Sequence, residues 1–183
     1  PRLPRRLKAP NQRIRRIDAA TLRTTTVAGN GQETFSGDNG PAASAALNSP
    51  TGIAVDGAGN LFIADLYNLR IRTVAAKTAV ISTLSGNGQP GFPGDGGPGI
   101  ASAFSFPAGI AIDGTGSLFV ADSNRVRKVD AATGNISTLA VTGKQGFSGD
   151  TGPAGAAVRP VRQHWGFQVT LPAGSKEWCW VGS

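Results

Sequence analysis

The sequence predicts an all-β fold made of repeated, four-stranded antiparallel sheets, and three observations support this prediction. First, residues 11–67 return at 68–124 without a gap, with 28 of 57 positions identical. Second, each copy holds two short apolar runs joined by a Gly-rich stretch. Third, the 26 Gly and 12 Pro residues lack the strict period of collagen and therefore indicate tight turns between short strands. A repeat of this length is a supersecondary unit that buries its apolar faces against its neighbours.

The first two strands of a unit are expected at 52–56 and 61–65, which read Gly-Ile-Ala-Val-Asp and Leu-Phe-Ile-Ala-Asp. Both runs are apolar on their two alternating faces, which is typical of strands covered on both sides. Residues 56–60 between them predict a hairpin loop, because Gly accepts positive φ and Asp can bond to its own backbone.

Two further strands complete the unit. Residues 70–74, Arg-Ile-Arg-Thr-Val, predict a strand with Ile71 and Val74 near the core, Arg70 and Arg72 outward, and a bulge. Residues 79–84 predict a fourth strand that tolerates solvent. Four antiparallel strands in so short a stretch resemble one blade of a β-propeller.

A long loop precedes each following blade, at 30–49, 87–106 and 143–157. Loops of this length usually have a structural or functional reason. We expect single helical turns at 41–47 and 98–104, and large apolar residues that plug the gap between adjacent blades. These plug residues are Phe35, Phe92, Phe147, Leu47 and Phe104.

Three recurring motifs resemble the NHL-repeat family of β-propellers in its bacterial long-loop form. They are Pro-x-Gly-Ile-Ala-Val-Asp-x-x-Gly-Asn-Leu-Phe-Ile-Ala-Asp at 50–65, Asn-x-Arg-Ile-Arg at 68–72 and Gly-Phe-x-Gly-Asp-x-Gly-Pro at 91–98. The resemblance covers residues 11–157. It implies a propeller of about six blades that serves as a binding scaffold, and it favours an extracytoplasmic location.

The chain then divides into a basic non-repeat arm at 1–10, NHL-type blades within 11–157 and an aberrant tail at 158–183. The expected blades are a partial one at 11–29 and full ones at 52–86 and 109–141. About two and a half blades are too few to close a propeller, which usually has four to eight. We therefore expect an open arc, a fragment of a longer protein, or a protomer that closes the propeller by self-association. Because the chain begins at Pro1 and contains no Met, a processed or cut chain is favoured.

The tail departs abruptly from the repeat after Ala157. It holds all three Trp residues, the only His and the only Cys, which are Trp165, Trp178, Trp180, His164 and Cys179. We expect a frameshift, a fusion or an added tail, with an aromatic cap for the last blade as the alternative. A single Cys excludes an internal disulfide. No apolar run reaches the roughly 18 residues of a membrane span.

The net charge of +7 belongs to one end of the chain. Seven of the 18 basic residues precede the first acid, Asp18, and the other 11 balance the 11 acids. A basic arm can bind phosphates or anionic surfaces, whereas a solvated terminus is the commoner case. Nucleic acid is not an expected partner of the neutral repeats. The candidate anion-binding residues are Arg2, Arg5, Arg6, Lys8, Arg13, Arg15 and Arg16.

No catalytic residue and no cofactor is predicted. Because His164 and Cys179 lie in the tail, the blades offer no histidine-based triad, imidazole metal site or thiol nucleophile. Some propeller lyases carry histidines on their blades, and nothing in this sequence matches those positions.

The repeated aspartates have structural and ligand-binding interpretations. Asp38, Asp95 and Asp150 lie in Gly-Asp-x-Gly-Pro loops and are weak candidate metal ligands. A calcium site normally needs about six to eight oxygens, and an Asx turn explains the spacing without a metal. Asp65 and Asp122 end their strands, so we expect them to pair with the arginines of the next strand. Arg70, Arg72, Arg125 and Arg127 then form a structural ladder, or an anion-binding stripe if they face a groove.

These observations predict a non-catalytic repeat scaffold whose inter-blade loops bind a protein or glycan partner. One alternative is a propeller hydrolase or lyase whose catalytic residues lie in other blades. The second alternative is polyanion binding through the N-terminal arm.

Overall fold

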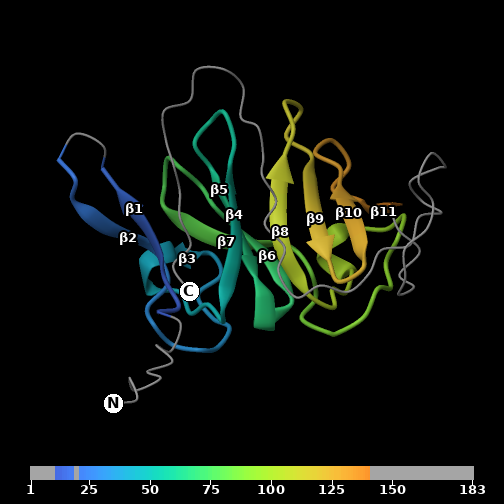
Figure 1. Ribbon diagram of the computed structural model, residues 1–183, viewed down its shortest axis with the longest axis horizontal. Coiled ribbons are helices and arrows are strands. Elements are labelled where there is room, and N and C mark those ends of the chain that lie inside the picture. The colour runs from blue at the N-terminus through green and yellow to red at the C-terminus, as the bar shows by residue number, and fades with distance from the viewer. Residues whose placement is uncertain (1–10, 19–20, 141–183) are drawn as a thin grey trace, which may run out of the picture.

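The computed structural model describes residues 11–18 and 21–140. In this part of the chain the strands form three antiparallel sheets that lie side by side in chain order (Figure 1). The helical segments among these residues are short 3-10 turns, and none is long and apolar enough to cross a membrane. The prediction of an all-β fold built from antiparallel blades is confirmed.

The first sheet is a two-stranded hairpin, which we call the half-blade. It consists of β1 (Ile14–Ile17) and β2 (Thr24–Ala28).

Two four-stranded blades follow the half-blade. The first full blade contains β4 (Pro50–Val55), β5 (Leu61–Asp65), β6 (Arg70–Val74) and β7 (Val80–Ser85). The second full blade contains β8 (Pro107–Ile112), β9 (Leu118–Asp122), β10 (Arg125–Val129) and β11 (Ile136–Ala140). In each blade consecutive strands are hydrogen-bonded neighbours, as in a meander, and the short β3 (Gly40–Pro41) pairs with the outer edge of β7.

The predicted hairpin loop between β4 and β5 is closed by a side chain. Asp56 Oδ1 accepts hydrogen bonds from the backbone N–H groups of Ala58, at 2.9 Å, and Asn60, at 2.8 Å. Asp113 accepts the equivalent bonds in the second full blade. The loop therefore forms as the sequence predicts, through local bonds from Asp to its own turn.

A bulge occurs at the same place in all three sheets. The register shifts between Ile14 and Arg15, between Ile71 and Arg72, and between Val126 and Arg127. The half-blade thus reproduces β6 and β7, and corresponds to the outer two strands of a full blade.

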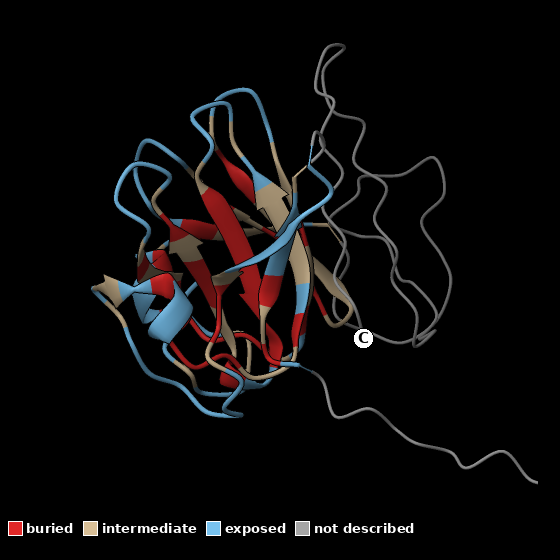
Figure 2. Cartoon of the chain, turned by 90° about the vertical axis from the view of Figure 1, so that its left-hand side faces the viewer, coloured by how far each residue is buried: buried red, intermediate tan, exposed pale blue. Residues whose placement is uncertain are grey.

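The cores lie between the sheets. One core cluster joins Ile14 and Ala28 of the half-blade to Ile63 and Ile81 of the first full blade, with Leu47 among them. A second cluster joins the opposite face of the first full blade to the second one and contains Phe104. Leu47 and Phe104 are both fully buried, which confirms that they plug the gaps between blades. Figure 2 shows the buried residues concentrated in the strands, with the hairpin loops exposed.

The inter-blade loops contain the expected helical turns as 3-10 helices. These are η1 (Ala42–Ser44) and η3 (Gly99–Ala101). The prediction for Phe35 and Phe92 is wrong, because neither ring enters the core clusters. Each ring stacks against an arginine instead, as described below, and Phe147 lies outside the described residues.

The outward face of the second full blade is apolar. A small hollow in it is lined by Gly109, Ala111, Phe119, Ala121 and Val126. The equivalents of Phe119 and Val126 in the first full blade, Phe62 and Ile71, are buried against the second blade. The same surface thus serves as an inter-blade contact in one repeat and, among the residues that the structure describes, is partly open in the next.

Candidate functional site

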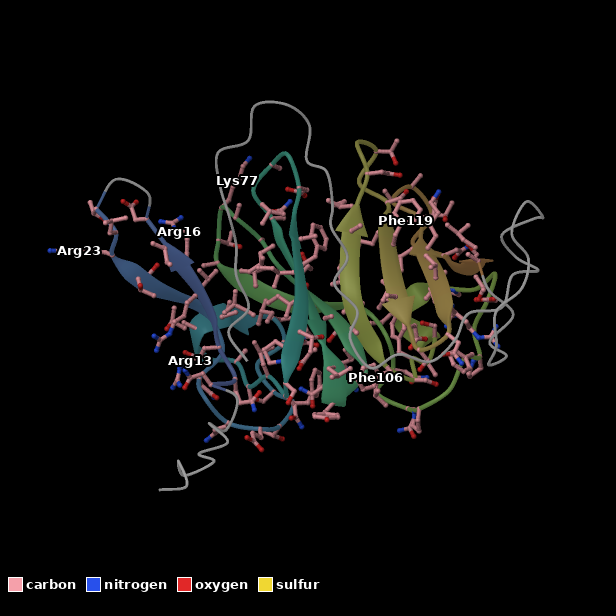
Figure 3. All side chains as sticks on the ribbon, in the orientation of Figure 1. Arg13, Arg16, Arg23, Lys77, Phe106 and Phe119 are labelled. Atoms are coloured by element: carbon pink, nitrogen blue, oxygen red, sulfur yellow. The ribbon has the colours of Figure 1, made fainter. Side chains whose placement is uncertain are left out.

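The inter-blade loops gather at one edge of the sheets, which we call the loop edge. Arg13 and Phe106 lie at this edge in Figure 3, whereas Lys77, in the turn between β6 and β7, lies at the opposite edge. The C-terminal ends of β5 and β9, which are Asp65 and Asp122, also lie at the loop edge.

Arg72 is the centre of a buried network at the loop edge. Its side chain has no exposed surface, and its guanidinium lies 2.7 Å from Asp38 Oδ1 and 3.3 Å from Asp65 Oδ2. Arg72 Nη2 also donates to the carbonyl of Ser36 at 3.2 Å. The second oxygen of Asp38 accepts from the Thr83 hydroxyl at 2.6 Å. One arginine therefore joins the loop to the strands of the first full blade.

The second full blade repeats this network around Arg127. The Arg127 guanidinium is fully buried and lies 2.8 Å from Asp95 Oδ1 and 3.6 Å from Asp122 Oδ2. It also donates to the carbonyl of Ala103 at 3.4 Å. The repetition confirms the prediction that Asp65 and Asp122 pair with arginines of the following strand.

Burial dominates the acid–base behaviour of the two strand-end aspartates. Desolvation raises the pKa of Asp65 above its ordinary value, against the lowering effects of Asn68, of the Asn48 N–H and of Arg72. Desolvation likewise raises the pKa of Asp122, against bonds from the N–H groups of Phe106 and Ser105. Both carboxylates are thus shielded from water and accept hydrogen bonds from protein groups instead.

The predicted outward orientation is wrong for Arg72, and Arg127 is buried in the same way. Arg72 pairs in register with Ile63, a core residue, so its side chain lies on the covered face of the sheet. The inter-blade loop folds over that face and brings Asp38 to the guanidinium. A buried charge of this kind needs such partners to offset its loss of hydration.

Arg70 and Arg125 hold the loop phenylalanines. The Arg70 guanidinium lies 3.9 Å from the centre of the Phe35 ring, and that of Arg125 lies 4.3 Å from the Phe92 ring. Arg70 also donates to the carbonyls of Asn68, at 2.9 Å, and Asn87, at 3.0 Å. Cation–π stacking and backbone bonds together keep the guanidinium at the loop edge rather than free for a ligand.

Aromatic side chains are exposed beside this network. Tyr67, two residues after Asp65, is 63% exposed, Phe106 is 43% exposed and Phe35 is 37% exposed. The backbone under them is fixed, because Tyr67 N–H donates to the Asn48 carbonyl and Phe106 N–H donates to Asp122 Oδ1. The repeat does not predict a functional role for Tyr67 or Phe106, because neither aromatic residue is repeated. Asn124 occupies the position equivalent to Tyr67, and Ser49 the position equivalent to Phe106.

The candidate metal ligands are engaged by protein groups. Asp38 binds Arg72 and Thr83, and Asp95 binds Arg127, so the Asx-turn explanation is replaced by an ionic one. Residues 11–18 and 21–140 contain no group of three or more His, Cys, Asp or Glu side chains placed to hold a metal ion. Asp150 lies outside the described residues.

The candidate anion-binding residues separate into two kinds. Arg13 donates to the carbonyls of Asn30 and Asn11, in the same way that Arg70 holds its own loop. Arg15 and Arg16 are exposed on β1. Arg2, Arg5, Arg6 and Lys8 lie outside the described residues.

Comparison with known proteins decides the family. The family model of the NHL repeat matches residues 47–73, which run from the plug residue Leu47 into β6. The chain contains a repeat of the NHL family. Residues 47–73 contain the Asp65 and Arg72 pair described above, so this NHL signature includes the core of the buried network.

Other proteins share parts of this NHL chain. It is 35% identical over 144 residues to Protein SUPPRESSOR OF QUENCHING 1, chloroplastic, of Arabidopsis thaliana, a match of 72% of this chain and 13% of that protein. It is 41% identical over 51 residues to human Teneurin-1, covering 28% of this chain and 2% of that protein. The chain therefore spans a small part of the length of these relatives.

Two solved structures from Bacteroides thetaiotaomicron share the fold of this chain over part of their length. One is a structural genomics protein of unknown function, with a TM-score of 0.53, 21% identity, and coverage of 62% of this chain and 28% of that one. The other is an auxiliary nutrient binding protein, with a TM-score of 0.50, 22% identity, and coverage of 71% and 33%. At these identities the likeness shows the fold alone.

Proposed function

We propose that this chain is a non-catalytic repeat scaffold whose inter-blade loops bind a protein or glycan partner. The observation that carries the proposal is the display of exposed aromatic side chains on anchored loops. Phe35, Tyr67 and Phe106 are exposed at the loop edge, beside the buried networks of Arg72 and Arg127.

Anchoring matters because an ordered loop loses less conformational entropy when it binds. Arg72 fixes the loop at 30–49 through Asp38 and Ser36, and Arg70 fixes its Phe35 ring. Aromatic side chains supply large contact areas and are enriched where proteins recognise partners. A pre-organised aromatic surface therefore supports binding rather than a purely structural role.

The two aspartates at the strand ends of the loop edge support a non-catalytic assignment. Asp65 and Asp122 are fully buried, and each accepts hydrogen bonds from the residues around it. The only His of the sequence, His164, and the only Cys, Cys179, come after both blades in the sequence. A candidate general acid or base needs access to substrate, and these aspartates are closed to it.

The solved relatives agree with a binding role without identifying the ligand. One of them is described as a nutrient binding protein, and this chain shares its fold over part of its length. We transfer only the general role of scaffold. This chain matches 13% of the Arabidopsis relative and 28% of the first solved structure, so no other property of either is transferred to it.

A defined glycan array and a panel of purified candidate proteins test the proposal. Each binder found with the wild-type chain is measured again with the double variant Tyr67→Ser and Phe106→Ser, which removes exposed aromatic area from the loop edge. We expect a loss of about tenfold or more in affinity for the true partner. Lys77→Ser is the matched control, because Lys77 is exposed at the opposite edge. Equal binding by the double variant and the wild type would contradict the proposal.

A further inference from the structure

Arg70 contacts two successive inter-blade loops. Its guanidinium stacks on the ring of Phe35, in the loop 30–49, and lies 3.9 Å from the ring centre. Its Nη2 donates to the carbonyl of Asn87, the first residue of the loop 87–106, at 3.0 Å. These two loops precede different full blades. One side chain therefore joins segments that are far apart in the sequence.

Both contacts of Arg70 end on groups that are themselves held. The Phe35 ring also lies 4.8 Å from the guanidinium of Arg72, the centre of the buried network. The side-chain amide of Asn87 donates to the Ala101 carbonyl at 3.1 Å, within its own loop. A movement of the Arg70 guanidinium is therefore felt in both loops.

The contacts of Arg70 require a planar, forked side chain. Nη1 donates to the carbonyl of Asn68 at 2.9 Å and Nη2 to that of Asn87, while the flat face of the guanidinium covers Phe35. The ammonium of a lysine carries the same charge but has neither this fork nor this face. The geometry thus depends on arginine rather than on positive charge alone.

Gly88 leaves room for the Arg70 guanidinium against the second loop. Its φ is +84°, and a Cβ at this position would overlap both Nη1 and Nη2 of Arg70. These atoms are the far end of a flexible side chain, so a Cβ at position 88 would displace the guanidinium and leave the sheet intact. The half-blade repeats the arrangement, because a Cβ at Gly31 would lie 2.7 Å from Nη1 of Arg13.

We propose that Arg70 couples the two loops, as a positioning residue that makes the placement of the Phe35 ring depend on the loop 87–106. The inference rests on the binding role proposed above and adds the residue that unites its loops. A partner then meets the two loops as one ordered surface, and ordering them separately costs it no further entropy.

Gly88→Ala tests the coupling without altering Arg70 or Phe35, and Gly96→Ala is the matched control. Gly96 lies in the same loop with a φ of +82°, and a Cβ there would meet nothing within 4 Å. The two variants therefore carry similar backbone strain and differ in the collision with Arg70. The full chain is labelled with para-fluorophenylalanine, and Phe35→Leu identifies the signal of Phe35 in the fluorine NMR spectrum.

We expect the Phe35 signal to move in Gly88→Ala and to keep its position in Gly96→Ala. It should also move in Arg70→Lys, which keeps the charge and loses the fork. An unchanged Phe35 signal in Gly88→Ala, or an equal movement in the control, would overturn the proposal.

Phe35→Leu reads the coupling in the reverse direction and decides the question if Gly88→Ala does not fold. The N–H of Gln89 donates to Asn87 Oδ1 at 2.8 Å, and its amide exchange should become faster when the ring is removed. The N–H of Thr115 makes the same kind of bond to Asp113 Oδ1, at 2.9 Å, and its exchange should stay unchanged. Unchanged exchange at Gln89 would contradict the coupling.

Partner binding gives a separate measurement. Each partner identified with the wild-type chain should bind Gly88→Ala about threefold or more weakly than Gly96→Ala, because a released ring must be ordered on binding. Equal affinities would overturn the positioning role of Arg70. If no partner is found, the scaffold proposal fails, whereas the fluorine signal still decides the coupling because it is measured on the free chain.

Discussion

Asp38 and Arg72 are 34 residues apart in the sequence, yet Asp38 Oδ1 lies 2.7 Å from Arg72 Nη2. This ion pair fastens an inter-blade loop to the third strand of the blade that follows. Asp95 and Arg127 repeat it at 2.8 Å in the next blade. The long loops are thus part of the architecture, and their exposed side chains are held at fixed positions relative to the sheets.

Removing the buried guanidinium should destabilise the protein strongly. Arg72→Met leaves Asp65 buried without its cation, and breaking a buried pair from one side costs about 3–5 kcal/mol. Urea unfolding measures this loss. Arg16→Met is the control, because Arg16 is exposed and its replacement should change the free energy of unfolding by about 0.5 kcal/mol or less. If Arg72→Met lowered the free energy of unfolding by no more than about 0.5 kcal/mol, the network would contribute little to stability.

Repeat periodicity predicted the strands, the hairpin loops, the plug residues Leu47 and Phe104, and the pairing of Asp65 with an arginine. It failed for the burial of Arg72, because the covering carboxylate of Asp38 comes from a distant loop. A short run of alternating polar and apolar residues predicts a half-exposed strand. The run itself does not show that a distant loop covers its polar face. The exposed Tyr67 and Phe106 were missed because they are not repeated.

The plug between the two full blades should be sensitive to truncation. Phe104 is fully buried in the core cluster that joins these blades, so Phe104→Ala should lower the free energy of unfolding by about 3–5 kcal/mol. Phe106→Ala provides the comparison, since Phe106 is two residues away and 43% exposed. Its cost should be about 1 kcal/mol or less. Thermal unfolding of both variants measures the contrast, and a larger cost for Phe106→Ala would refute the assignment of the plug.

The close approach of the blades should reject a side chain at Gly52. A Cβ there would lie 2.6 Å from the Ala108 carbonyl oxygen and 3.0 Å from Gly109 Cα, both of which are backbone atoms of β8. Gly52→Ala should therefore separate β4 from β8 and cost about 1–3 kcal/mol.

Gly57→Ala is the matched control for Gly52→Ala, because a Cβ at Gly57 would meet nothing within 4 Å. The free energy of unfolding of the control variant should lie within about 0.5 kcal/mol of that of the wild type. Equal urea midpoints for the two variants would mean that the blades can move apart without loss.

The buried and exposed aspartates should respond to pH in opposite directions. Burial raises the pKa of Asp65 in the folded protein above 3.8, its ordinary value. The folded state then holds the proton over a wider range than the unfolded state does. The stability that Asp65 contributes is therefore full below a pH of about 4 and is lost as pH rises through the raised pKa.

Asp130 provides the opposite case on the same protein. A hydrogen bond from Lys128 is the main cause that lowers the pKa of its exposed carboxyl. Its contribution is present above a pH of about 4 and is lost as pH falls through the lowered pKa. Urea unfolding from about pH 2.5 to 7 compares the wild type with Asp65→Asn and Asp130→Asn. The stability of the wild type relative to Asp65→Asn should fall as pH rises above the pKa of Asp in the unfolded state. The stability of the wild type relative to Asp130→Asn should rise with pH below that pKa. Slopes of the same sign would contradict the assignment of Asp65 as a carboxyl governed by burial, because desolvation is the largest cause acting on its pKa and opposes the effect of the Lys128 bond on Asp130.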